Sequence, residues 1–249
     1  MKGSQDFAIQ LTANLDAAIR YLRQHKPSPC ALWIDALCIN QSLAAERNHQ
    51  VGLMSKIYSS AKQVLILIWL GPPCQDSAFA FETLSSGHLK RRAIGRFIAA
   101  VELLLRRDWF GRLWIAQELT LSRQEPIIHH GSQTIGWDTF AQSIEIVVRR
   151  IKGRENCVID GYLPEFTATN IRDTSADHIG SHPPAVVAQA AIVLSLRDMR
   201  SVGFEARFGR RMLHTAYSRA TDPRDRVYGL LGFSRFHRAA IIPDYKKPY

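Results

Sequence analysis

The 249-residue sequence lacks any hydrophobic run long enough to cross a membrane. Its longest fully apolar run, residues 64–70, has seven residues, whereas a membrane-spanning helix needs about 20. The first six residues, MKGSQD, are not followed by an apolar segment of the kind found in secretory signals. We therefore expect a chain without a membrane span that works in the cytoplasm.

Cysteine is scarce, with only Cys30, Cys38, Cys74 and Cys157. None forms a C-x-x-C pair and none has a histidine at zinc-finger spacing, so a disulfide scaffold and a structural metal site are not expected. We predict four reduced thiols. Cys38 could act as a nucleophile only beside a base that the sequence does not place, and a buried thiol is the simpler interpretation.

Acidic residues are also few, since 22 Asp and Glu stand against 32 Lys and Arg, which gives a net charge of +10. Such a field attracts phosphates and nucleic acids. The basic residues are scattered, however, and no RNA-binding aromatic signature or helix-turn-helix pattern accompanies them. We expect a solvated basic surface with no specific nucleic-acid partner, and keep non-specific nucleic-acid binding as an alternative function.

Hydrophobic patterning predicts strands that alternate with helices. Short apolar runs of the kind found in strands buried on both faces lie at residues 31–34 and 64–70, and residues 127–130 before Gly131 are also expected to form a strand. Apolar residues at helical spacing occur at residues 11–23, 43–58, 94–105 and 109–121, and another helix is expected from about residue 77. This alternation predicts an α/β fold with a parallel sheet flanked by helices over residues 1–150. We expect a loop or linker over residues 151–184 and a mainly helical region over residues 185–249.

Several motifs then follow one another in a fixed order. The first is LWIDALCINQ at residues 32–41, and the others are ER at 46–47, WLGP at 69–72, WFGRLWIAQE at 109–118, TDPRDRVYGLLG at 221–232 and PDY at 243–245. Together they resemble the fungal heterokaryon-incompatibility (HET) domain and the tail that commonly follows it. Members of this family usually open with a segment like Leu-Ser-Tyr-x-Trp-Gly, and nothing like it precedes Phe7. We therefore expect a truncated chain that lacks its opening strand.

The resemblance implies a role in fungal nonself recognition and programmed cell death, through assembly with itself or with a sensor protein. The HET family is also similar to TIR domains in the order of its elements, which implies a TIR-like sheet. Some TIR domains cleave NAD with a glutamate in a Trp-x-x-x-Glu pattern, and Trp114 and Glu118 have that spacing. The resemblance thus makes Glu118 a candidate catalytic residue with NAD as substrate, and it implies no bound cofactor. The simpler interpretation is a surface glutamate paired with Arg112 or Arg123.

Other residues of the motifs leave two interpretations open. Asp35 follows a predicted strand, so it could face a ligand at the sheet edge or cap the next turn. Asn40 and Gln41 could bind a ligand or, more simply, the backbone of their own loop. Four tryptophans are expected to be core aromatics, namely Trp33, Trp69, Trp109 and Trp114. The pair His129-His130 lies in a predicted strand and should point to opposite faces, which argues against a shared metal ion.

Overall fold

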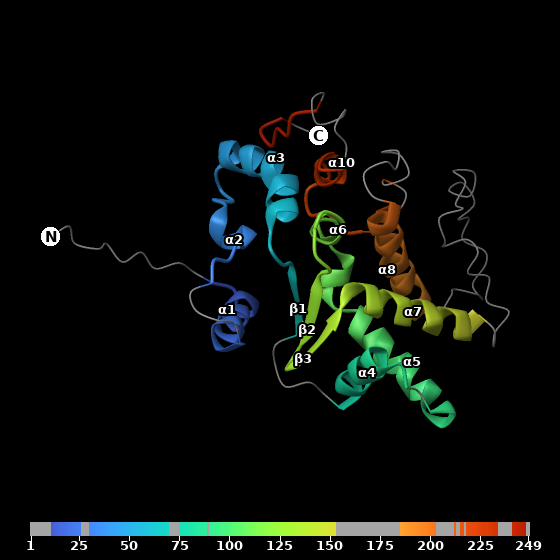
Figure 1. Cartoon of the computed structure of the whole chain (residues 1–249). Helices are drawn as coiled ribbons and strands as arrows, with labels where there is room; N and C mark the ends of the chain where they lie inside the picture. Colours follow the sequence, from blue (N-terminus) through green and yellow to red (C-terminus); the bar gives the residue numbers. More distant parts are fainter. Residues whose placement is uncertain are drawn as a thin grey trace, which may run out of the picture.

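The structure is a computed structural model that describes residues 11–25, 30–69, 75–88, 90–152, 185–202, 212, 215–216, 218–233 and 241–247. It is mainly helical around one small sheet (Figure 1). The helices are α1 (Ala13–His25), α2 (Asp35–Cys38), α3 (Ala44–Ser60), α4 (Gln75–Ser86), α5 (Ile94–Leu105), α6 (Ile115–Thr120), α7 (Trp137–Lys152), α8 (Ala185–Val202) and α10 (Asp225–Leu231). Two 3₁₀ turns, η1 (Arg91–Ala93) and η2 (Asp108–Gly111), flank α5.

The sheet has three strands in the order β1 (Leu65–Trp69), β2 (Ile127–His130) and β3 (Gln133–Gly136). β1 and β2 are parallel, with Ile66 opposite Ile128, as the alternating pattern predicts. β3 returns antiparallel to β2 through a tight turn in which Gly131 has a φ of 58°, a conformation that favours glycine. The predicted α/β class is therefore confirmed, although the sheet is small and mixed rather than fully parallel.

The strand predicted at residues 31–34 is wrong. Ile34 has extended backbone angles (φ −136°, ψ 120°), but residues 31–34 pair with no strand in the described part of the chain. Leu32 is 43% exposed, so this run is not buried on both faces. An apolar run becomes a strand only where a neighbour completes its backbone hydrogen bonds, and the run itself carries no information about that neighbour.

The single helix predicted for residues 109–121 is also wrong. The chain forms the 3₁₀ turn η2, crosses an extended step at Arg112 and then enters the short helix α6. The interruption comes from Arg219, more than 100 residues away, which forms an isolated parallel bridge with Arg112. A contact so distant in sequence cannot be inferred from local periodicity.

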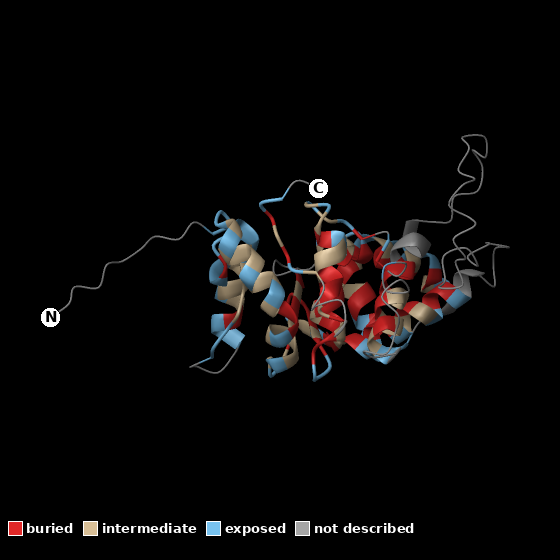
Figure 2. Cartoon of the chain, turned by 90° about the horizontal axis from the view of Figure 1, so that it is seen from above, coloured by how far each residue is buried: buried red, intermediate tan, exposed pale blue. Residues whose placement is uncertain are grey.

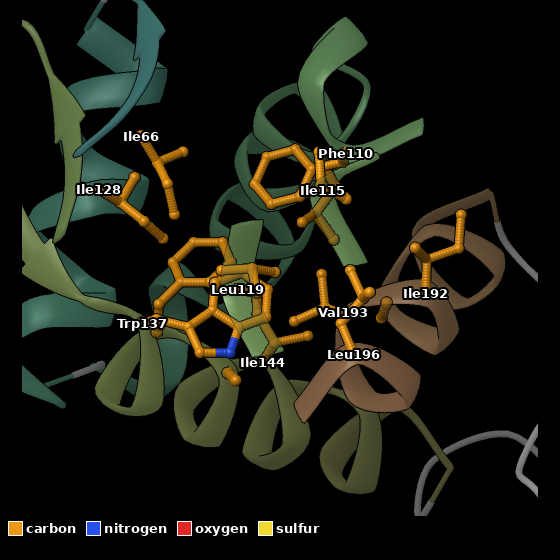
Figure 3. Packing of buried hydrophobic residues seen from close by; sticks show 14 of the residues in the cluster. Ile66, Phe110, Ile115, Leu119, Ile128, Trp137, Ile144, Ile192, Val193 and Leu196 are labelled. Carbon is orange, nitrogen blue, oxygen red and sulfur yellow. The ribbon is translucent and has the colours of Figure 1, made fainter. Parts of the chain in front are cut away.

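The hydrophobic core lies on the side of the sheet that α4, α5, α7 and α8 cover, whereas α1–α3 on the other side are mostly half-buried or exposed (Figure 2). Trp137, Phe110 and Phe140 are fully buried at its centre, and Ile192, Val193 and Leu196 from α8 join the same cluster (Figure 3). The tryptophans expected in the core, Trp33, Trp109 and Trp114, are only half-buried, and the side chain of Trp69 lies outside the described residues. Most of the predicted linker, residues 153–184, and two cysteines, Cys74 and Cys157, lie outside them as well.

Candidate functional site

Glu118, the sequence-predicted catalytic residue, lies on α6, whose position is fixed by a long-range backbone contact. The Leu113 amide donates to the Arg219 carbonyl at 3.0 Å, and the Arg219 amide donates to the Gly111 carbonyl. The Arg219 side chain also lies against Gly111, where an added Cβ atom would come within 2.7 Å of the guanidinium and displace that flexible, exposed group. The bridge therefore sets the direction in which the chain enters α6.

The Glu118 carboxyl group is held by a neighbouring tryptophan. The indole Nε1 of Trp109 donates a hydrogen bond to Glu118 Oε2 at 3.2 Å. Burial raises the pKa of Glu118, and the negative charge of Asp35 raises it further, while Arg112 and the indole hydrogen bond act in the opposite direction. The expected surface ion pair is not what the geometry shows, because the carboxylate that forms an ion pair with Arg112 belongs to Asp35.

Asp35, for which the sequence left a ligand contact and a turn cap open, is the first residue of α2 rather than its N-cap. Its Oδ1 accepts a hydrogen bond from the adjacent Ala36 amide at 2.8 Å. Its Oδ2 lies 3.7 Å from Arg112 Nη2, and both side chains are nearly half exposed. The positive charge of Arg112 therefore acts on both Asp35 and Glu118, which are 83 positions apart in the sequence.

Tyr58 from α3 completes the cluster of Asp35, Tyr58, Trp109, Arg112 and Glu118, which we call the Glu118 cluster. Burial raises the pKa of the Tyr58 phenol, and the negative charges of Glu118 and then Asp35 raise it further. Its ring meets the Trp33 indole edge to face, with ring centroids 5.8 Å apart. A phenol held neutral next to two carboxyl groups can donate a hydrogen bond to either a carboxylate or a ligand.

Asn40 and Gln41, the remaining polar motif residues near α2, form hydrogen bonds within their own loop. Asn40 Oδ1 accepts hydrogen bonds from the Ser42 amide at 3.2 Å and the Ser42 hydroxyl at 2.7 Å. Gln41 Nε2 donates to the Asp35 carbonyl at 3.4 Å. Cys38 is a free, exposed thiol, so the expectation of a buried thiol is wrong. Leu37 beside it is exposed too, because α2 is a single turn with no buried residue.

Trp114 is the N-cap of α6, the helix that contains Glu118, but its indole lies in a different environment. The Trp114 indole donates to Asp225 Oδ2 at 3.2 Å, across 111 positions of sequence. Asp225 begins α10, and the turn before it starts at Asp222, whose Oδ1 accepts from the Arg224 amide at 3.0 Å. Residues 222–225 thus form a turn that leads into α10, but the N-cap of this helix is Arg224, not Asp222, and it makes no side-chain cap hydrogen bond.

The Glu118 cluster is separate from the cavity of about 50 Å³ that the structure contains. That cavity lies among α4, α5 and α7, where Leu84, Phe97 and Val147 line it. Within the described part of the chain, no three His, Cys, Asp or Glu side chains gather where a metal ion could bind. The chemistry available to the Glu118 cluster is that of a carboxyl group with a raised pKa, which can transfer a proton or stabilise a developing positive charge.

Sequence reasoning missed the role of Tyr58 and the pairing of Arg112 with Asp35. Trp109 and Arg112 stand in the same motif block as Glu118, so their proximity could have been suspected. Tyr58 gives no such signal, because it has the spacing of an ordinary helix-face residue. Only the packing of α3 beside α6 brings it to the cluster.

Comparison with known proteins shows which family the N-terminal part of the chain resembles. Residues 2–118 match the family model of the heterokaryon incompatibility protein (HET) domain, a segment that ends on Glu118 and contains every member of the Glu118 cluster. This part of the chain is therefore similar to the HET family, as its ordered motifs suggest.

One curated relative is "Heterokaryon incompatibility protein 6, OR allele" of the fungus Neurospora crassa. It is 43% identical over 81 residues, which cover 31% of this chain and 12% of the relative. The chain thus corresponds to a small part of that longer protein. No solved structure matches this chain. Among the described residues, no helix is both long and apolar enough to span a membrane.

Proposed function

We propose that this chain is a module of fungal heterokaryon incompatibility, which signals programmed cell death after nonself recognition. The observation that carries the proposal is the HET family match over residues 2–118, together with the name of the Neurospora crassa relative. In this proposal the module acts by assembling with itself or with a sensor protein.

The exposed side of the HET segment supports an assembly role. Four leucines in this region are at least 37% exposed, namely Leu11, Leu32, Leu37 and Leu43. These leucines lie on α1–α3 or next to them, and they are the apolar side chains that this side offers to a partner. Figure 2 shows that α1–α3 form a layer with few buried residues compared with the helices across the sheet.

Inducible expression in a filamentous fungus tests this function. Expression of the full chain should arrest growth and kill cells. Leu43→Asp should remove this effect, because it places a charge on the apolar surface; Leu43 is the N-cap of α3, where aspartate is a favoured residue, so the helix itself is not weakened. The matched control is Leu103→Asp on α5, on the other side of the sheet. Leu103 is 52% exposed, and this variant should still kill cells. Normal growth with abundant wild-type protein, or equal effects of the two substitutions, would contradict the proposal.

A second function, cleavage of NAD to nicotinamide and ADP-ribose, is favoured by the setting of Glu118. As the bond between nicotinamide and ribose breaks, positive charge develops on the ribose, and water then adds to that carbon. A partly buried carboxylate close to this carbon stabilises such a charge more strongly than one in water. The Trp109 hydrogen bond and the raised pKa show that Glu118 is held in a partly dehydrated position.

Purified protein incubated with NAD tests the second function. Glu118→Gln keeps the shape of the side chain and removes its charge, so NAD consumption should fall by about 10²–10³-fold. Glu102→Gln on α5 is the control, since Glu102 forms an ordinary surface ion pair with Arg106. If wild-type protein leaves NAD intact, or if Glu118→Gln consumes it at the wild-type rate, Glu118 is structural and the module signals by assembly alone.

A further inference from the structure

The segment Pro243–Tyr245 lies across α3 and α10 in the manner of a bound peptide. Two backbone amides of this segment are each held by a side chain of the surface beneath. The Tyr245 amide donates to Asn48 Oδ1 at 2.8 Å, and the Asp244 amide donates to the Tyr228 hydroxyl at 3.1 Å. Side chains that bind the backbone of an extended segment are the means by which proteins hold peptides.

The Tyr245 side chain is buried against polar and charged side chains of the same surface and is 9% exposed. Its hydroxyl donates a hydrogen bond to Asp225 Oδ1. The guanidinium of Arg47 lies 3.9 Å from the ring centroid and that of Arg224 lies 5.1 Å away. Guanidinium groups at these distances attract an aromatic ring, and a carboxylate selects a phenol over a phenyl group.

Asp225 connects this surface to the HET segment. Its second oxygen accepts the Trp114 hydrogen bond, so the carboxylate is shared between the Tyr245 phenol and an indole next to α6. Asn48 and Arg47 belong to α3, whereas Asp225 and Tyr228 belong to α10. The surface for the Asp-Tyr segment is therefore assembled from both parts of the chain.

We propose that this surface, made by Arg47, Asn48, Arg224, Asp225 and Tyr228, is a docking site for a Pro-Asp-Tyr segment that exchanges between copies. In one chain, residues 243–245 occupy it from within; in an assembly, the same segment of a second copy takes their place. The inference rests on the self-assembly part of the proposed function and names the contact through which two copies meet.

Binding of a labelled peptide with the sequence IIPDYKKPY, residues 241–249, tests the site. In the wild-type chain the attached segment competes at an effective concentration in the millimolar range. Tyr245→Ala removes this competitor's ring, so the full-length Tyr245→Ala protein should bind the peptide at least about tenfold more tightly than wild type. Tyr245→Phe provides a second receptor, in which the ring contacts remain and only the Asp225 hydrogen bond is lost; its affinity should fall between the two.

Two further changes separate specific docking from loose adhesion. A peptide with phenylalanine in place of the tyrosine should bind about tenfold more weakly, because it lacks the hydroxyl that Asp225 accepts from. Asn48→Ala in the Tyr245→Ala protein should weaken binding, whereas Asn40→Ala, an exposed loop change, should not. Equal peptide affinity for wild type and Tyr245→Ala, or no effect of Asn48→Ala, would overturn the site.

Exchange between copies is tested by analytical ultracentrifugation. Differently labelled wild-type chains should co-sediment, Tyr245→Ala in both chains should abolish this association, and an excess of the peptide should separate the wild-type chains. Failure to co-sediment, or association that the peptide leaves unchanged, would overturn the second copy as the occupant. Because both measurements are made in solution with purified protein, their failure is distinct from failure of the growth assay.

Discussion

A single buried imidazole makes the stability of this protein depend on pH. His130 is fully buried and stacks on Phe81, with ring centroids 5.2 Å apart. Neither ring nitrogen has a hydrogen-bond partner in the described part of the chain. Burial lowers the pKa of His130, and the positive charge of Arg107 lowers it further. The adjacent His129 faces the other way, where its Nδ1 lies 3.1 Å from the Tyr21 hydroxyl, as expected for successive strand residues.

The lowered pKa fixes the sign of the pH effect. Below about pH 6.5 the unfolded chain binds a proton at this histidine that the folded chain does not, so the free energy of unfolding decreases as the pH falls. His130→Leu should reduce this loss by roughly 1 kcal/mol between pH 7 and pH 5. Urea unfolding at several pH values measures it.

His49→Leu, at an exposed position, is the control for the substitution of an imidazole by leucine. Glu118 and Asp225 act in the opposite sense. Burial raises both pKa values in the folded protein, so their contribution to the free energy of unfolding decreases as the pH rises. Both carboxyl groups are present in every variant, so the difference between variants isolates His130. Parallel pH profiles for wild type and His130→Leu would show that the imidazole does not titrate on unfolding.

At the scale of elements, the last turn of α6 is held from outside by a side chain of α8. The Arg200 guanidinium donates to the carbonyls of Leu119 and Ser122 and to the Ser122 hydroxyl, the last at 2.9 Å. The final carbonyls of a helix have no partner within it, and a cation placed there satisfies both their hydrogen-bonding capacity and the helix dipole. α6 has only six residues, so this external cap fixes the helix that carries Glu118.

Removal of the cap should destabilise the whole molecule. Arg200→Met keeps the apolar stem and removes the charged donors, with an expected cost of about 2–3 kcal/mol because buried carbonyls lose a charged partner. Arg197→Met, on the same helix, should cost less than about 1 kcal/mol, since Arg197 forms a partly exposed ion pair with Glu145. Thermal unfolding followed by circular dichroism compares the two, and equal losses would contradict the capping role.

The elements differ in how far their sequences predict them. The strand at residues 65–69 and the helices at 75–86 and 94–105 follow from local apolar patterns, and the structure confirms them. The helix over 109–121 fails because the Arg219 bridge interrupts it, and the strand at 31–34 fails because no neighbouring strand is present in the described residues. β3 gives no apolar alternation of its own and exists as the return of a hairpin.

The residues of the candidate site also differ in how far the sequence predicts them. Glu118, Asp35 and Arg112 could be named from their motifs, but the ion pair between Arg112 and Asp35 and the place of Tyr58 beside them could not. The Tyr245 site is still further from local inference: its motifs are visible in the sequence, yet the partners in each hydrogen bond lie 16 to 197 positions apart. Periodicity describes one element at a time, whereas these contacts depend on how distant elements pack.

For the molecule as a whole, the net charge of +10 calls for a test of nucleic-acid binding. Many of the described arginines are engaged in ion pairs, which supports a solvated surface rather than a dedicated groove. Duplex DNA should therefore bind only weakly, with a Kd of about 10⁻⁴–10⁻⁶ M at physiological salt, and without sequence preference. Phosphate contacts release counterions, so the affinity should fall steeply as salt is added.

Fluorescence anisotropy with two unrelated duplexes over a range of salt concentrations measures this binding. The two duplexes should give the same affinity at each concentration. A nanomolar Kd for one sequence and not for the other would make nucleic-acid recognition the leading function.

The hydrogen bond between Trp114 and Asp225 also sets an order of events during synthesis. The ribosome must add 111 residues after Trp114 before the carboxylate that holds its indole exists. At 5–20 residues per second this takes roughly 6–20 s. During that interval, the start of α6 lacks both this bond and the Arg219 bridge, so Glu118 has no fixed position. The Glu118 cluster is thus completed only after residue 225 has been added, and a product terminated before that point would carry the HET segment without an assembled site.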